Sequence, residues 1–196
     1  CCWAAMSSPP TAYGDLVLTT DGRTIPCRLL GENDEGLRVV TGDPAGPREV
    51  LLTHATIVAR LQGAEEIKHI EACDDASKLS AWSAAYYHAG YETLARRALR
   101  RALSLDRKLG DQPLTVKADA SARGPTPAVR YARFRNLAVA RDRVASLADK
   151  DAAGLVSAAR WARRAGLTEE AAHYLRLAWR EDPTLGDITT LAEVWG

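Results

Sequence analysis

Two hydrophobic patterns follow one another along the chain. Between residues 15 and 60, apolar and polar side chains alternate, which is the period of β-strands because successive side chains point to opposite faces. In the first run, Leu16 and Leu18 fall on one face. From about residue 77 onward, the pattern is that of helices joined by short turns. The sequence therefore predicts an α+β chain, with the strands first and the helices after them.

The front segment contains five strand-like runs separated by turns. Asp21-Gly22 supplies a tight turn, because both residues tolerate positive φ. Pro26 cannot donate a hydrogen bond to a sheet, so its strand is predicted at an edge or bent there. Five short strands cannot bury two faces as a flat sheet, so closure into a small β-barrel over residues 15–62 is expected. The predicted strands are Asp15–Thr20, Arg23–Leu30, Leu37–Thr41, Arg48–Leu52 and Ile57–Arg60, with a single helical turn at Thr53–Ala55.

The pattern D-L-V-L-x-x-D-G-R-x-I over residues 15–25 resembles the leading strands of small SH3-like or Sm-like barrels on exported bacterial proteins. The resemblance covers about 45 residues. It implies a fold and no activity, because the nucleotide-contacting residues of Sm proteins have no counterpart in this sequence.

The back segment repeats itself. Leu79–Asp111 aligns without gaps on Leu155–Asp187 at an offset of 76 residues, with 11 of 33 positions identical. Each copy is predicted as a helix, a turn and a second helix, over about residues 77–105 and 151–181. Gly90 and Gly166 stand at the two turns, where a helix can end at positive φ. Internal repetition of this kind is typical of a helical solenoid.

The two copies resemble tetratricopeptide repeats. That family places a glycine between its helices, small residues five and twelve positions later, and Asp-Pro at the end. Small residues stand there because the two helices cross closely. The departures are Arg107 in place of the terminal proline of copy one, and a spacing about twice the usual repeat length. The matching residues are Gly90, Ala95, Ala102 and Asp106 in copy one, and Gly166, Ala171, Ala178 and Asp182-Pro183 in copy two.

Other segments complete the predicted organisation. Residues 63–76 are expected to be a linker between the barrel and the helical domain, which extends over residues 77–196. A helix is predicted at about 127–148, entered through the loop Gly124–Pro127. Residues 112–123 fit a flexible loop or a degenerate first helix, and Ile188–Trp195 resembles the opening of another helix.

The charge of the chain is divided. The net charge of +1 arises from −6 over residues 1–75, with 6 Lys/Arg and 12 Asp/Glu, and +7 over residues 76–196, with 20 Lys/Arg and 13 Asp/Glu. Solvated helix faces account for such a basic segment, and an anionic partner is the alternative. No apolar run approaches the roughly 20 residues that a membrane-spanning helix requires, so no transmembrane segment is predicted.

Residues 1–14 are predicted to be a leader or the remnant of an export signal. Ala12 and Gly14 are small residues at the spacing that signal peptidase recognises. The alternatives are a disordered leader around Pro9-Pro10, and a lipoprotein that carries its lipid on Cys1. The expected location is the periplasm or cell envelope, with the cytoplasm as the alternative.

Two cysteines, Cys27 and Cys73, remain outside this leader. Neither belongs to a zinc-binding pair. They either form one disulfide that ties the barrel to the first helix, or stay as two separate thiols.

No catalytic or metal-binding constellation is present in the sequence. The four histidines are isolated, and no nucleophile elbow or phosphate-binding loop occurs. We therefore expect no enzyme activity, no metal and no cofactor.

The expected function is a protein-interaction or assembly scaffold. In tetratricopeptide folds the first helix of each hairpin lines a groove that grips partner segments. This resemblance selects Tyr87 and His88 in copy one, and Arg160, Arg163 and Arg164 in copy two. The three arginines share one helix face and fit an acidic peptide, whereas a solvated polar face is the plain alternative.

Two other functions stay open. One is a binder of nucleic acid or another anionic polymer, which would use the predicted helix at about 127–148. The other is the interaction region of a longer enzyme. The basic residues that the first alternative would use are Arg130, Arg133, Arg135, Arg141 and Arg143.

Overall fold

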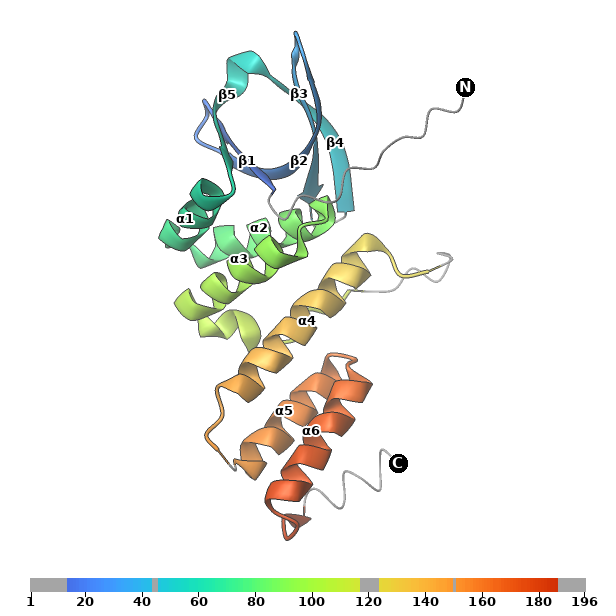
Figure 1. Ribbon diagram of the computed structural model, residues 1–196. Helices are drawn as coiled ribbons and strands as arrows, with labels where there is room; N and C mark the ends of the chain where they lie inside the picture. Colours follow the sequence, from blue (N-terminus) through green and yellow to red (C-terminus); the bar gives the residue numbers. More distant parts are fainter. Residues whose placement is uncertain (1–13, 44–45, 117–123, 150, 187–196) are drawn as a thin grey trace, which may run out of the picture. The chain divides into compact units, whose positions relative to one another are not determined.

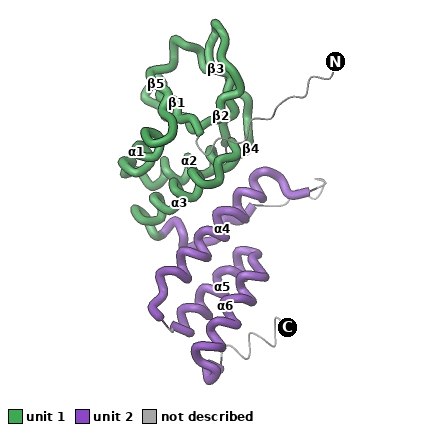
Figure 2. The backbone as a smooth tube through the Cα atoms, in the orientation of Figure 1, with its two compact units in different colours: residues 1–107 green, residues 108–196 purple. Residues whose placement is uncertain are grey.

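A computed structural model describes residues 14–43, 46–116, 124–149 and 151–186. The chain forms two compact units, residues 1–107 and residues 108–196 (Figure 2). Among the described residues, the first contains a β-sheet and three α-helices, and the second contains three α-helices. Figure 1 shows how these elements follow one another along the chain. The α+β class predicted from the sequence is thus confirmed for the described residues.

The sheet has five antiparallel strands, of which the first four follow one another as a meander and the fifth pairs with the first. Its order is β4-β3-β2-β1-β5, and it curls strongly (Figure 1). Among the described residues β4 and β5 are the outer strands and do not pair with each other, so the predicted closure into a barrel is not confirmed. The strands are β1 Asp15–Thr19, β2 Thr24–Asn33, β3 Gly36–Asp43, β4 Gly46–Thr53 and β5 Ile57–Gln62, with the 3-10 helix η1 at His54–Thr56.

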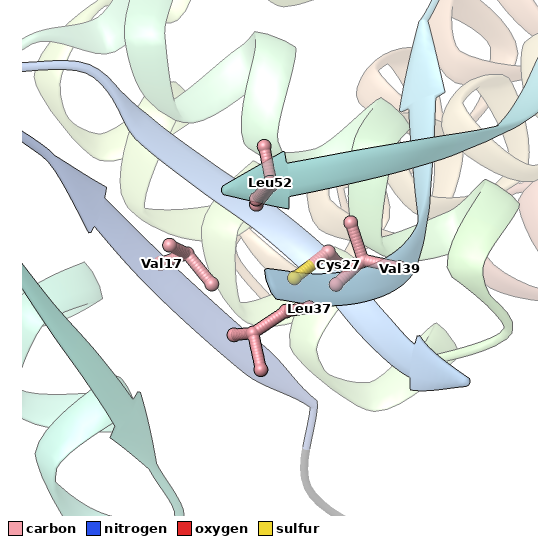
Figure 3. Packing of buried hydrophobic residues seen from close by; sticks show 5 residues of the cluster. All are labelled: Val17, Cys27, Leu37, Val39 and Leu52. Carbon is pink, nitrogen blue, oxygen red and sulfur yellow. The ribbon is translucent and has the colours of Figure 1, made fainter. Parts of the chain in front are cut away.

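The inner face of the curled sheet holds a hydrophobic cluster. It draws on four strands, and its side chains point toward one another (Figure 3). Alternation along the strands explains the set, because every second residue faces inward. The members are Val17 of β1, Cys27 of β2, Leu37 and Val39 of β3, and Leu52 of β4.

Pro26 lies in a strand that pairs on both sides. β2 is bonded to β1 and to β3, so the predicted edge position is wrong. The hydrogen-bonded pairing of β2 with β3 begins at Cys27, opposite Thr41. Pro26 therefore does not need a backbone N–H to bond to β3. The Thr41 hydroxyl instead donates to the Pro26 carbonyl at 3.2 Å. The register of β2 shifts further on, between Leu29 and Gly31.

Three helices complete the first unit. They are α1 Ala64–Ala72, α2 Ala76–Ala89 and α3 Glu92–Leu105. Residues 63–76 were predicted to be a linker, and no helix was expected there. They contain α1, whose Glu66 and Ile70 are fully buried. Asp75 caps α2 by accepting from the Lys78 amide at 2.9 Å. Gly90 ends α2 at φ 93°, in the left-handed region that the sequence analysis assigned to it.

Helix α2 packs on the sheet as well as on α3. A Cβ placed on Gly42 of β3 would lie 2.7 Å from the His88 Cβ and 2.8 Å from the Ala85 Cα. The main chains therefore approach so closely that only glycine fits at this position.

The second unit contains a long helix followed by a hairpin. Its helices are α4 Pro127–Ala145, α5 Ala152–Arg164 and α6 Thr168–Glu181, and the 3-10 helix η2 Arg107–Gly110 precedes them. Thr126 and Asp151 cap α4 and α5 through their side chains. Gly166 adopts φ 73° between α5 and α6. Leu167 occupies the N-cap of α6, and Thr168 is the first residue of the helix.

Some predictions concern residues outside those described. The leader over 1–14, apart from Gly14, is one of them, together with the lipidated Cys1. The helix predicted to open at Ile188–Trp195 is another.

Candidate functional site

The stretch of chain that follows η2 is bound to helices α4 and α5 through its main chain. The Asn136 side chain accepts from the Leu114 amide at 2.9 Å and donates to the Leu114 carbonyl at 3.0 Å. Arg143 donates to the Gly110 carbonyl at 2.8 Å, and the Trp161 indole donates to the Asp111 carbonyl at 3.1 Å. These bonds hold residues 110–114, which leave η2 through a turn at Asp111 and Gln112, as a wall beside the helices.

Buried polar groups form this contact. Asn136 and Trp161 are each 2% exposed. Arg135 donates to the Leu109 carbonyl, and burial lowers the pKa of its guanidinium. Arg143 also stacks 5.2 Å above the Trp161 ring. Buried donors of this kind are stable only when their partners are present, so residues 109–114 are part of the fold of the second unit.

A groove lies next to this wall, within the second unit. Its volume is about 490 Å³. Leu114 and Val116 give it an apolar side, and Arg133 and Arg164 give it two exposed guanidinium groups. We call it the α4–α6 groove. It is lined by Leu114–Val116, Val129, Ala132, Arg133, Asn136 and Arg164–Glu170.

The turn between α5 and α6 forms one end of the groove. Gly166 allows the sharp bend, and Leu167 caps α6 without a side-chain hydrogen bond. Glu169 and Glu170 follow in the first helical turn, where the helix dipole favours negative charge. The groove therefore has arginines on its wall and carboxylates at the α6 end, which suits a ligand with a limited number of acidic groups.

The three arginines predicted as a binding cluster lie exposed on α5. Arg164 lines the α4–α6 groove, whereas Arg160 and Arg163 are not among its lining residues. The sequence-based cluster thus supplies one groove residue. Arg133 and Asn136, which complete the polar lining, were not in that prediction. Asn136 could have been noticed, because it interrupts the apolar positions between Phe134 and Leu137.

Tyr87 and His88, the other predicted partner-binding residues, belong to α2 in the first unit. Both are half-buried. Their rings meet edge to face with centroids 5.6 Å apart, and the His88 Cβ packs against Gly42 of β3. The sheet of this unit thus covers the helix face to which His88 belongs.

The first unit has a groove of its own, between β2, β3 and α2. Its volume is about 450 Å³, and Lys78, Trp82 and Arg23 are among its lining residues. Lys78 lies 5.2 Å from the Trp82 ring, and Arg23 is paired with Asp21 at 2.5 Å. Its cations are therefore already engaged, and it is the weaker candidate.

The two cysteines are free thiols. Cys27 is fully buried in the sheet, and burial raises the pKa of its thiol to about 12. Cys73 follows α1 and donates to the Asp75 carbonyl at 3.8 Å. In the structure, Cys27 and Cys73 are therefore two separate thiols and do not form the disulfide that was the other alternative.

Two further findings concern the described residues alone. They contain no group of three or more side chains suited to a metal ion. None of the described helices is long and apolar enough to cross a membrane.

Comparison with family models, with curated proteins and with solved structures found no match to this chain.

Proposed function

We propose that this chain is a non-enzymatic protein-interaction scaffold whose second unit binds an extended peptide in the α4–α6 groove. The observation that carries the proposal is the way in which Asn136 binds Leu114. An asparagine that pairs with both the amide and the carbonyl of one residue, here Leu114 of the same chain, recognises main chain. A partner segment would lie beside the same wall.

The charges of the groove indicate what the partner carries. Arg133 and Arg164 suit a carboxylate, either a side chain or a C-terminus, because guanidinium groups bind carboxylates through paired hydrogen bonds. Glu169 and Glu170 repel a second cluster of negative charge. The proposed partner is therefore an extended peptide with one or two acidic groups.

We also propose that the helical hairpins are tetratricopeptide-like and that the sheet is a small SH3-like or Sm-like module. The small residues predicted at the close crossings support the first part, because Ala95, Ala102, Ala171 and Ala178 are each 0% exposed. The strand order, in which β5 pairs with β1, and the curl of the sheet (Figure 1) support the second. The export expectation gives the periplasm or cell envelope as the place where the scaffold would act.

Two of the five arginines behind the nucleic-acid alternative have structural partners. Arg135 and Arg143 bind the carbonyls of Leu109 and Gly110. Three arginines of α4 remain exposed. Three positive charges can neutralise only a few phosphates of a nucleic-acid backbone. The groove therefore favours the peptide-binding proposal.

The test is selection of ligands from a random peptide library displayed on phage, followed by measurement of Kd by fluorescence anisotropy. We expect enrichment of extended peptides with one or two carboxylates. R133E/R164E should weaken the best peptide at least about tenfold, since two charge-assisted contacts become repulsive.

Two control double variants test whether the peptide binds in the α4–α6 groove. R141E/R180E changes the same number of charges at exposed positions outside the groove and should alter Kd by less than about twofold. R160E/R163E tests the α5 face outside the groove. No enrichment, or equal losses in all three double variants, would contradict the proposal.

A further inference from the structure

The groove of the first unit lies where two strands of its sheet separate. β2 pairs with β1 as far as Thr24, and β3 pairs with β4 as far as Asp43. β2 and β3 pair with each other only from Cys27 and Thr41 onward, so beyond this pair the two strands no longer share hydrogen bonds. Pro26 accounts for the end of the pairing, because proline has no N–H to donate to β3.

Helix α2 packs against both β2 and β3 and supplies the other wall of this groove. Ile25 and Pro26 line it from β2, and Ala81, Trp82 and Ala85 line it from α2. The two alanines leave space that longer side chains would fill. The volume of about 450 Å³ is in the range of small-molecule sites, so the groove can hold an apolar group of modest size.

The charged lining of this groove is positive. Its described lining residues include Lys78 and Arg23 but no Asp or Glu. Arg23 is paired with Asp21, whereas Lys78 lies 5.2 Å from the centroid of the Trp82 ring. An aromatic face attracts an ammonium group without neutralising it, so the charge of Lys78 and its N–H donors can still serve an anion. The groove is the weaker candidate for a peptide, but this arrangement suits a small anion.

The support for Lys78 is in place before a ligand binds. Trp82 is 3% exposed, and its ring stacks on His69 of α1 with 5.4 Å between the centroids. Asp75 accepts from the Lys78 amide at 2.9 Å and fixes the first turn of α2. A charge that is already positioned costs less to order when a ligand arrives.

We propose that this groove binds a small amphipathic carboxylate, with its apolar body between β2 and α2 and its carboxylate at the Lys78 ammonium. A single carboxylate suits a single ammonium group that no acidic lining residue neutralises. The first unit as a whole has 12 Lys/Arg and 14 Asp/Glu, a net charge of −2, so the attraction for an anion is local to the groove. The proposal does not depend on the α4–α6 groove, and either can fail alone.

The test titrates three probes into the isotope-labelled full chain at neutral pH and records amide shifts by nuclear magnetic resonance. Octanoate has an apolar body and a carboxylate, 1-octanol has the body alone, and acetate has the charge alone. Octanoate should shift amides at residues 22–26, 41–42 and 78–85. Octanol should bind at least about tenfold more weakly, because it lacks the contact with the ammonium, and acetate should cause no localised shifts.

Four variants at exposed positions separate the charge from the space. Lys78→Gln should weaken octanoate about tenfold, to the level of octanol. Ala81→Leu should abolish binding, because the larger side chain fills the groove. Lys68→Gln of α1 and Ser77→Leu of α2 make the same changes outside the groove lining and should alter Kd by less than about twofold. Circular dichroism checks that each variant is folded.

Three results would overturn the proposal. They are equal affinity for octanoate and octanol, unchanged octanoate affinity in the Lys78 variant, and no shifts with octanoate at millimolar concentration. Octanoate shifts confined to residues 114–116 and 164–170 would assign the probe to the α4–α6 groove. That result too would overturn this proposal, while leaving the peptide-binding function untouched.

Discussion

Single residues in this protein show where buried polarity has to be balanced. Asn136 and Glu66 are both almost completely buried, yet their surroundings differ. Asn136 hydrogen-bonds both main-chain groups of Leu114, whereas burial raises the pKa of the Glu66 carboxyl well above its ordinary value. The first side chain should therefore stabilise its unit, and the second should make the stability of its unit depend on pH.

Asn136→Ala should lower the free energy of unfolding of the second unit by about 1–3 kcal/mol, because the main chain of Leu114 loses both hydrogen bonds to the buried Asn136 side chain. Urea unfolding followed by far-UV circular dichroism measures this. Arg133→Ala, an exposed change one turn earlier on the same helix, should cost less than about 0.5 kcal/mol. Equal costs would show that the Asn136 contact does not hold the wall.

The chain beginning at Cys1 should lose stability as the pH rises from about 5 to 8. The folded pKa of Glu66 is about 7, above its ordinary value, so the folded state binds the proton more tightly than the unfolded state does. The stabilisation is complete below the unfolded pKa and is lost as the pH rises through 7. E66Q should flatten this part of a plot of unfolding free energy against pH. An unchanged slope would assign the pH dependence to other groups.

Cys73 should react with a thiol reagent far faster than Cys27 in a chain in which Cys1 and Cys2 are replaced by serine. Cys27 is fully buried and its thiol pKa is raised, so little thiolate is present. The absorbance of released thionitrobenzoate should show one fast equivalent and a second only in denaturant. Two fast equivalents would mean that Cys27 is accessible. None, before or after unfolding, would mean that the two cysteines pair.

At the scale of elements, helix α2 joins the two kinds of structure in the first unit. It packs against α3 on one side and against β3 on the other, where Gly42 lets the main chains meet. That contact means that the face of α2 that carries His88 is occupied by the sheet of its own unit. In the second unit, Trp161 of α5 binds the wall instead.

Gly42→Ala should destabilise the first unit by about 1–3 kcal/mol, because the added methyl group meets the main chain of α2. Gly31→Ala is the matched control, since a Cβ at Gly31 meets nothing within 4 Å. Thermal unfolding of both variants should therefore show a lower Tm for the Gly42 variant alone. Identical Tm values would place α2 farther from the sheet.

The elements themselves were largely predictable from local chemistry. Gly90 and Gly166 marked the helix bends, because a glycine that ends a helix acts within one turn. Helix α1 was missed, since its buried face contains Glu66 and only two isoleucines. The edge position of Pro26 was wrong, because strand order depends on contacts between distant residues.

The site was predictable only in part for the same reason. Arg164 was found from its helix face, but the groove also needs Asn136 of α4 and the wall. Those residues are separated by more than 20 positions in the sequence, and no local pattern indicates that they meet.

At the scale of the whole molecule, the two units offer different surfaces. The first has a net charge of −2, from 12 Lys/Arg and 14 Asp/Glu, and the second has +3, from 14 and 11. A charge of +3 over a unit of this size is too small for strong binding of a phosphate backbone. The basic character of the second unit is better suited to a carboxylate in a defined groove.

Electrophoretic mobility shift with single-stranded RNA and duplex DNA should therefore show no complex at micromolar protein and about 150 mM salt. Binding that appears only at lower salt would be the non-specific attraction expected of exposed arginines. A tight complex at 150 mM salt would favour the nucleic-acid alternative over the scaffold.

The most direct measurement for the peptide-binding account is a nuclear magnetic resonance titration of the isotope-labelled chain with its best selected peptide. Amide shifts are expected to concentrate at residues 114–116 and 164–170 and near Arg133. Shifts spread over the sheet of the first unit, or an unchanged spectrum at saturating peptide, would contradict it.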